Sequence, residues 1–171
     1  RPVMLVGKGV RLAKAETEFF ALAAKLRIPI LTSFSGYDII SEDNPYYYGR
    51  EGAVGQRRGN FIVQNSDLVL ALGTRLNFRM VSFNPEYFAR GAKKIVVDID
   101  AAELSKPTIK PDIAANADVK TFMAMLLERI GKDGIAEKDE WLAYADRIFE
   151  RYKVPLKEQY EEQGFVNMYV F

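Results

Sequence analysis

The stretch that decides the fold is Val3-Met4-Leu5-Val6-Gly7-Lys8-Gly9, near the start of the chain. Four consecutive apolar residues are typical of a short strand that is buried on both faces of a parallel sheet, and the glycines end it. The same pattern returns twice: residues 68–72 are apolar and precede Gly73-Thr74-Arg75, and residues 95–97 precede Asp98-Ile99-Asp100. Each run therefore predicts a buried strand whose carboxyl end carries glycine or polar residues.

The segments between these strands have the periodicity of helices. Apolar residues recur at helical spacing over residues 13–26, 119–130 and 137–153, and residues 56–65 are also predicted to be helical, with residues of mixed exposure. Asp118 is the expected N-cap of the helix over 119–130. Gly59 interrupts the second helix, which predicts close packing against a neighbouring backbone. The expected strands are residues 3–6, 29–32, 67–72, 94–98 and 112–115, with a loop over 33–55 and a turn over 85–89. Strands alternating with helices predict a doubly wound α/β fold, Rossmann-like, with a mostly parallel sheet and helices on both faces.

The composition excludes several classes of function. The 171 residues carry a net charge of +1, which gives no basic excess for binding nucleic acid. The absence of cysteine excludes disulfides and thiolate metal sites, and the absence of histidine removes the commonest general base. No apolar run is long enough to span a membrane and no signal peptide is visible, so we expect a cytoplasmic protein. The start at Arg1-Pro2, directly before a strand, leads us to expect a fragment of a longer chain.

Candidate binding residues follow the predicted strands, because open parallel sheets bind ligands just outside the carboxyl ends of their strands. Gly7-Lys8-Gly9 lies between a strand and a helix, where it could cradle a diphosphate or simply form a turn. Leu12 stands where the full dinucleotide-binding motif requires glycine, so both interpretations stay open.

Three further segments place charge at the ends of strands or beside glycine. Gly73-Thr74-Arg75-Leu76-Asn77-Phe78-Arg79 offers two arginines for phosphate binding or for a surface ion pair. Gly49-Arg50-Glu51-Gly52-Ala53-Val54-Gly55, followed by Gln56-Arg57-Arg58, permits close backbone approach to a ligand, or only turns the chain. After the next strand, we expect Asp98 to face a ligand and Asp100 to cap a helix.

The remaining conspicuous residues predict packing rather than chemistry. Tyr46-Tyr47-Tyr48 could stack on a base, but such runs, like Trp141, are more often part of a core or an interface. Without histidine and cysteine, the chain shows no recognisable nucleophile–base motif. The residues alone therefore predict a binding or scaffold domain with no catalytic residue and no metal site.

Together, these segments resemble the central domain of thiamine-diphosphate-dependent enzymes of the acetolactate synthase group. The resemblance rests on residues 2–9, 49–60, 67–79, 96–100 and 112–118, in this order. It implies a sheet of about six strands, in a domain that holds FAD in acetolactate synthase and ADP or nothing in related enzymes. By resemblance, a bound FAD would contact Gly7, Gly9, Thr32, Ser33, Gly52, Ala53, Val54, Gly73, Thr74, Arg75, Arg79, Asp98, Ile99, Asp118 and Val119.

The resemblance also implies a larger parent enzyme, a transferase or lyase that acts on a 2-keto acid. Thiamine diphosphate and magnesium would be bound by flanking domains that this chain lacks, in a homodimer or homotetramer. Residues 1–131 would form the central nucleotide-binding-like domain, and residues 132–171 a helix and linker toward the thiamine-diphosphate-binding domain. Two alternatives stay open: a structural spacer domain of a related decarboxylase or lyase, and a stand-alone nucleotide-binding module.

Overall fold

The computed structural model describes residues 1–131, 135–136, 138–168 and 170. Within these residues, six parallel strands form one sheet in the order β3-β2-β1-β4-β5-β6. The strands are β1 (Pro2–Val6), β2 (Ile30–Thr32), β3 (Tyr47–Arg50), β4 (Leu68–Leu72), β5 (Lys93–Asp98) and β6 (Ile113–Asn116). The chain builds the sheet outward from β1 in one direction and then, from β4 onward, in the other. This is the strand order of a Rossmann fold, and it confirms the predicted doubly wound α/β architecture.

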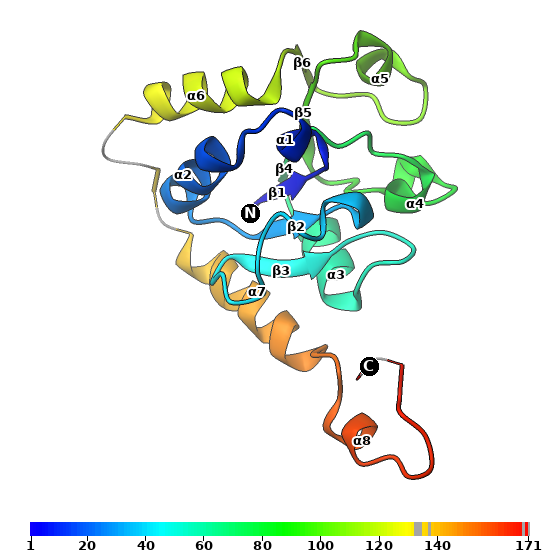
Figure 1. Cartoon of the computed structure of the whole chain (residues 1–171). Helices are drawn as coiled ribbons and strands as arrows, with labels where there is room; N and C mark the ends of the chain where they lie inside the picture. The colour runs from blue at the N-terminus through cyan, green and yellow to red at the C-terminus, as the bar shows by residue number, and fades with distance from the viewer. Residues whose placement is uncertain (132–134, 137, 169, 171) are drawn as a thin grey trace.

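Helices connect the strands and cover both faces of the sheet (Figure 1). They are α1 (Gly9–Leu12), α2 (Glu16–Leu26), α3 (Arg57–Asn65), α4 (Phe78–Val81), α5 (Ala101–Ser105), α6 (Val119–Ile130), α7 (Asp139–Arg151) and α8 (Lys157–Tyr160), with 3₁₀ turns at η1 (Phe34–Gly36) and η2 (Pro85–Tyr87). Helices α2 and α6 pack together on one face, whereas α3 and α7 pack together on the other.

The two faces have separate hydrophobic cores because successive side chains of a strand point in opposite directions. In β1, Val3 and Leu5 join the core beneath α3 and α7, whereas Met4 and Val6 join the core beneath α2 and α6. All four side chains are fully buried. The unbroken apolar run of this strand is therefore explained by burial on both sides, as predicted.

Two predicted segments were wrong in detail. The helix expected over residues 13–26 begins only at Glu16, as α2, because Lys14 has a left-handed φ of 51° that a helix does not contain. The separate short helix α1 precedes it and was not predicted. The loop expected over residues 33–55 contains strand β3 and turn η1. Strand β3 is a short edge strand that includes Gly49, and its register against β2 is irregular, so it lacks the apolar pattern of the central strands.

The close packing expected at Gly59 is confirmed. A Cβ atom at this position would lie 2.3 Å from the carbonyl oxygen of Arg50, which is far inside van der Waals contact. The glycine lets α3 lie directly against the end of β3.

Helix α7 packs into the core beneath α3, and Trp141 anchors it. The Trp141 side chain is buried, and its Nε1 donates a hydrogen bond of 2.8 Å to the carbonyl oxygen of Pro2 at the start of β1. The Tyr48 hydroxyl donates a bond of 2.6 Å to Asp146, which fixes the helix to β3. These contacts confirm the packing role expected for Trp141 and for the tyrosine run. The domain boundary after residue 131 stays a prediction.

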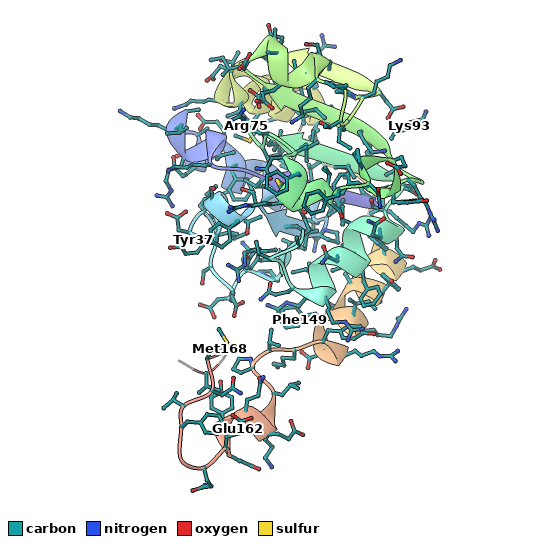
Figure 2. The ribbon with its side chains drawn as sticks, turned by 90° about the vertical axis from the view of Figure 1, so that its right-hand side faces the viewer. Tyr37, Arg75, Lys93, Phe149, Glu162 and Met168 are labelled. Atoms are coloured by element: carbon teal, nitrogen blue, oxygen red, sulfur yellow. The ribbon has the colours of Figure 1, made fainter. Side chains whose placement is uncertain are left out.

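The last described residues lie away from the sheet. Helix α8 and the segment that follows it extend from the end of α7, and Figure 2 shows Met168 in this part of the chain. The side chains of Phe165, Val166 and Met168 are exposed. Among the described helices, none combines the length and the apolar character that a membrane span requires.

Candidate functional site

A cleft of about 750 Å³ opens at the carboxyl ends of the strands, where the sheet order reverses between β1 and β4. Figure 2 shows the two ends of the sheet: Arg75 follows β4 at the cleft, and Lys93 begins β5 at the opposite edge. Most of the predicted contact residues line the cleft. They are Gly9, Ser33, Val54, Gly73, Thr74, Arg75, Arg79, Asp98, Ile99, Asp118 and Val119.

The glycines after β1 and β4 allow two loops to touch. A Cβ atom at Gly7 would lie 2.3 Å from the carbonyl oxygen of Gly73, and one at Gly9 would lie 2.7 Å from the Gly73 Cα. The backbone N–H of Gly7 donates a hydrogen bond to the carbonyl oxygen of Leu72, and the N–H of Gly9 donates one to the carbonyl oxygen of Gly73, both at 3.0 Å. Loop packing therefore requires glycine at these positions, whether or not a phosphate binds between the loops.

Arg75 forms the surface ion pair that was one of its two predicted roles. Its side chain is 75% exposed, and its Nε donates to a carboxylate oxygen of Glu103 at 2.6 Å. Lys106 binds the other oxygen of Glu103 at 2.9 Å. Burial raises the pKa of Glu103, but the hydrogen bonds from Arg75 and Lys106 outweigh it and leave the pKa below its ordinary value. Because the Arg75 side chain is exposed, a ligand phosphate could approach it and compete with Glu103 as its partner.

The aspartates at the cleft organise the ends of strands and helices. Asp100 accepts a hydrogen bond of 2.9 Å from the N–H of Ala102 and caps α5, as predicted. Asp118 accepts from the N–H of Thr121 at 3.0 Å and caps α6, also as predicted. Asp98 is nearly buried and accepts from the N–H of Asp100 at 2.9 Å. Its predicted role toward a ligand stays a prediction.

Four predicted contact residues lie outside the cleft lining, namely Gly7, Thr32, Gly52 and Ala53. The buried hydroxyl of Thr32 lies 3.1 Å from the hydroxyl of Tyr47 and joins β2 to β3. The backbone N–H of Gly52 donates to the side-chain oxygen of Asn60 at 2.7 Å, and the side-chain nitrogen of Asn60 donates to the Gly52 carbonyl oxygen at 3.1 Å. Contact of these four residues with a ligand stays a prediction.

The charged residues at the start of α3 do not line the cleft either. The Arg58 side chain is buried, its Nη2 donates to Glu42 at 3.0 Å, and its guanidinium lies 4.1 Å from the centre of the Phe149 ring. Arg57 lies 4.9 Å from the ring centre of Tyr152. Both arginines therefore join α3 to α7 or its end, which is a structural role.

Several cleft residues are absent from the prediction. They are Lys8, Leu12, Ala13, Phe34, Ser35, Glu51, Asn77, Phe78, Met80 and Val97. Glu51 differs from the others because it is 3% exposed and neither carboxyl oxygen has a hydrogen-bond partner. Burial raises its pKa from 4.5 to about 8. Its place between glycines in the sequence marks an unusual loop, but does not reveal that the side chain turns inward.

The arrangement offers recognition groups rather than a metal centre. Across the described parts of the chain, no three histidine, cysteine or acidic side chains are grouped to hold a metal ion. The cleft combines a cationic edge at Arg75 and Arg79 with exposed aromatic rings at Phe34 and Phe78. The amino end of α6 also lines the cleft, where the Asp118 side chain caps it. These features suit an anionic ligand that also carries a planar ring.

Comparison with known proteins agrees with this architecture. Residues 1–126 match the family model described as thiamine pyrophosphate enzyme, central domain. The chain is 35% identical to the probable acetolactate synthase large subunit of Methanocaldococcus jannaschii over 156 residues, which are 91% of this chain and 26% of that protein. It is 36% identical over 150 residues to the acetolactate synthase large subunit of Cyanidium caldarium, covering 86% of this chain and 25% of that protein.

A third relative shows a similar identity and a similar coverage. The acetolactate synthase isozyme 1 large subunit of Escherichia coli is 34% identical over 149 residues, covering 87% of this chain and 26% of that protein. The chain thus spans about a quarter of the length of these relatives. The match over most of its sequence and the sheet order lead to one conclusion: the chain belongs to the family of thiamine pyrophosphate enzyme central domains.

Proposed function

We propose that the cleft binds the nucleotide FAD or ADP, and that the chain serves as the central domain of a thiamine-diphosphate-dependent parent enzyme acting on 2-keto acids. The observation that carries the proposal is the cleft of about 750 Å³ at the point where the sheet order reverses. Doubly wound sheets bind nucleotides at this point, and the volume lies within the usual range for small-molecule and cofactor sites.

The residues of the cleft fit the chemistry of a nucleotide. Arg75 is exposed, and a phosphate would compete for it with its present partner Glu103, whose side chain is largely buried. Phe34 and Phe78 expose rings on which a base or a flavin can stack. The parent enzyme would thus hold its nucleotide by phosphate contacts at the strand ends and by stacking at the rim.

The further parts of the proposal concern the parent enzyme. Thiamine diphosphate and magnesium would be held by domains that flank residues 1–131, and residues 132–171 would lead toward one of them. The parent would be a cytoplasmic homodimer or homotetramer with transferase or lyase activity. Because this chain carries no histidine or cysteine, it should not turn over pyruvate alone when supplied with thiamine diphosphate and magnesium. Turnover by the isolated chain would contradict this assignment.

A second candidate function is that of a structural spacer. Loop packing alone accounts for Gly7, Gly9 and Gly73, and the ion pair with Glu103 alone accounts for Arg75. On this alternative the cleft is a remnant that binds nothing. Nucleotide binding, by the isolated chain or by the parent, separates the two candidates.

Calorimetric titration of FAD and ADP provides the test. The protein, the Arg75→Ala variant and the Arg90→Ala variant are titrated in parallel, since Arg90 is an exposed arginine outside the cleft lining. Loss of one charge-assisted contact should weaken nucleotide binding measurably in Arg75→Ala and leave it unchanged in Arg90→Ala. Equal affinities in all three proteins would remove Arg75 from the site, and absence of binding would favour the spacer.

A further inference from the structure

Glu51 is the one carboxyl group in the described parts of the chain that has both oxygens buried and unpaired. It follows β3, lines the cleft and is 3% exposed. Buried polar groups in proteins are almost always hydrogen-bonded, so an unpaired carboxyl at the wall of a cleft points to a missing partner. Glu51 lines the cleft, so a ligand bound there can supply that partner.

The surroundings of Glu51 do not stabilise a charged carboxylate. Three arginines belong to the segments around it: Arg50 precedes it, Arg58 lies on α3 and Arg79 lies on α4. Arg58 pairs with Glu42, and Arg79 lies 6.0 Å from the ring centre of Phe78. Among the described residues, none of these arginines forms an ion pair with Glu51. An isolated buried charge is very costly, so the group remains protonated instead.

The pKa agrees with this geometry. Burial is the whole cause of the rise from 4.5 to about 8, with no contribution from a neighbouring charge. At neutral pH the Glu51 side chain is therefore predominantly an uncharged carboxylic acid. Such a group offers one O–H donor and one adjacent acceptor oxygen, and it does not repel the phosphates of a nucleotide.

We propose that Glu51, as a neutral acid, selects the ring edge of the ligand by donating one hydrogen bond to it and accepting another. This inference rests on the proposed nucleotide site and adds to it the residue that reads the ring. The complementary edge sets an acceptor beside a donor. Adenine presents such an edge with a ring nitrogen and its amino group, and a flavin presents one with a carbonyl oxygen and a ring N–H.

Two substitutions separate the donor–acceptor role from packing. Glu51→Gln retains one donor and one acceptor but does not titrate, whereas Glu51→Met has similar length and offers neither. Calorimetry with ADP, FMN and FAD at pH 7 and pH 9 compares both variants with the unaltered protein. Dependence on Glu51 for ADP alone assigns it to adenine, and dependence for FMN alone assigns it to the flavin ring.

The expected results follow from the pKa of about 8. The unaltered protein should lose about tenfold in affinity between pH 7 and pH 9, because only the protonated form binds. The affinity of Glu51→Gln should not show this loss between pH 7 and pH 9. Titration of the ligand phosphate and of other groups affects both proteins equally, so the difference between their pH dependences reports Glu51 alone. Glu51→Met should bind about tenfold more weakly than the unaltered protein at pH 7, since the ligand edge would be left unpaired.

The failures of the two proposals are distinguishable. If the unaltered protein and Glu51→Met bind a nucleotide equally well, Glu51 does not read the ring, although the nucleotide site stands. If no nucleotide binds at pH 7, the proposed function is overturned, and the role of Glu51 with it. Infrared spectra of the ligand-free protein should show at pH 7 a protonated-carboxyl band that Glu51→Gln lacks. Absence of that band would overturn the neutral acid without reference to any ligand.

Discussion

Raising the pH from 5 to 8 should destabilise the folded protein through Glu51, whose pKa burial raises from 4.5 to about 8. Below pH 4.5 this carboxyl is protonated in both the folded and the unfolded chain, so its full contribution to stability is present. Between the two pKa values the unfolded chain releases the proton and the folded chain keeps it. The free energy of unfolding therefore falls as the pH rises, and the loss is complete above the folded pKa.

The magnitude follows from the separation of the two pKa values. Each unit of difference corresponds to about 1.4 kcal/mol, and about two and a half units of the separation are realised between pH 5 and pH 8. The expected loss is about 3.5 kcal/mol, which is a large part of the stability of an ordinary domain. Glu51→Gln should not show it, because glutamine has no proton to release.

Urea denaturation at pH 5, 6, 7 and 8 measures this effect as a difference between the two proteins. Asp67 and Glu103 have lowered pKa values, so their contributions are lost as the pH falls, but these contributions are equal in both proteins and cancel. The free energy of unfolding of the unaltered protein should fall relative to that of Glu51→Gln as the pH rises. Two curves that run parallel within about 0.5 kcal/mol would refute a neutral, buried Glu51.

Three further predictions concern the fold. Trp141→Phe removes the hydrogen bond to the first strand and leaves a buried carbonyl unpaired, so urea denaturation should show a loss of about 1–3 kcal/mol; a loss below that range would mean that water replaces the bond. Gly7→Ala drives a Cβ into the neighbouring loop and should cost about 1–3 kcal/mol or more, whereas Gly91→Ala, which meets nothing within 4 Å, should cost far less; similar losses would contradict the loop contact. Amide exchange at residues 165–168 should be much faster than at residues 68–72, and equal protection would place the tail in the core.

The central strands were predictable because burial on both faces leaves a simple trace in the sequence. Residues 3–6 and 68–72 are unbroken apolar runs, and both became central strands as expected. Strand β3 left no such trace, since it lies at the edge and contains Gly49. The break between α1 and α2 occurs because Lys14 adopts a left-handed backbone conformation. The spacing of apolar residues gives no indication of this conformation.

The site was predictable where topology alone places residues. Loops after β1, β4 and β5 must meet at one edge of a parallel sheet, and so Gly9, Thr74 and Asp98 were found. Glu51 was not, because its inward orientation depends on the packing of a glycine-rich loop against α3 and α4. Glu103 was not identified as the partner of Arg75 for a similar reason, as the pair is formed between separate loops.

We propose that a nucleotide occupies the cleft at the carboxyl ends of β1, β4 and β5. A crystal structure of the protein grown with saturating FAD or ADP tests it most directly. We expect density for the nucleotide across these strand ends, with Arg75 turned from Glu103 toward a phosphate and a ring edge against Glu51. An empty cleft, or a nucleotide bound elsewhere on the protein, would contradict it.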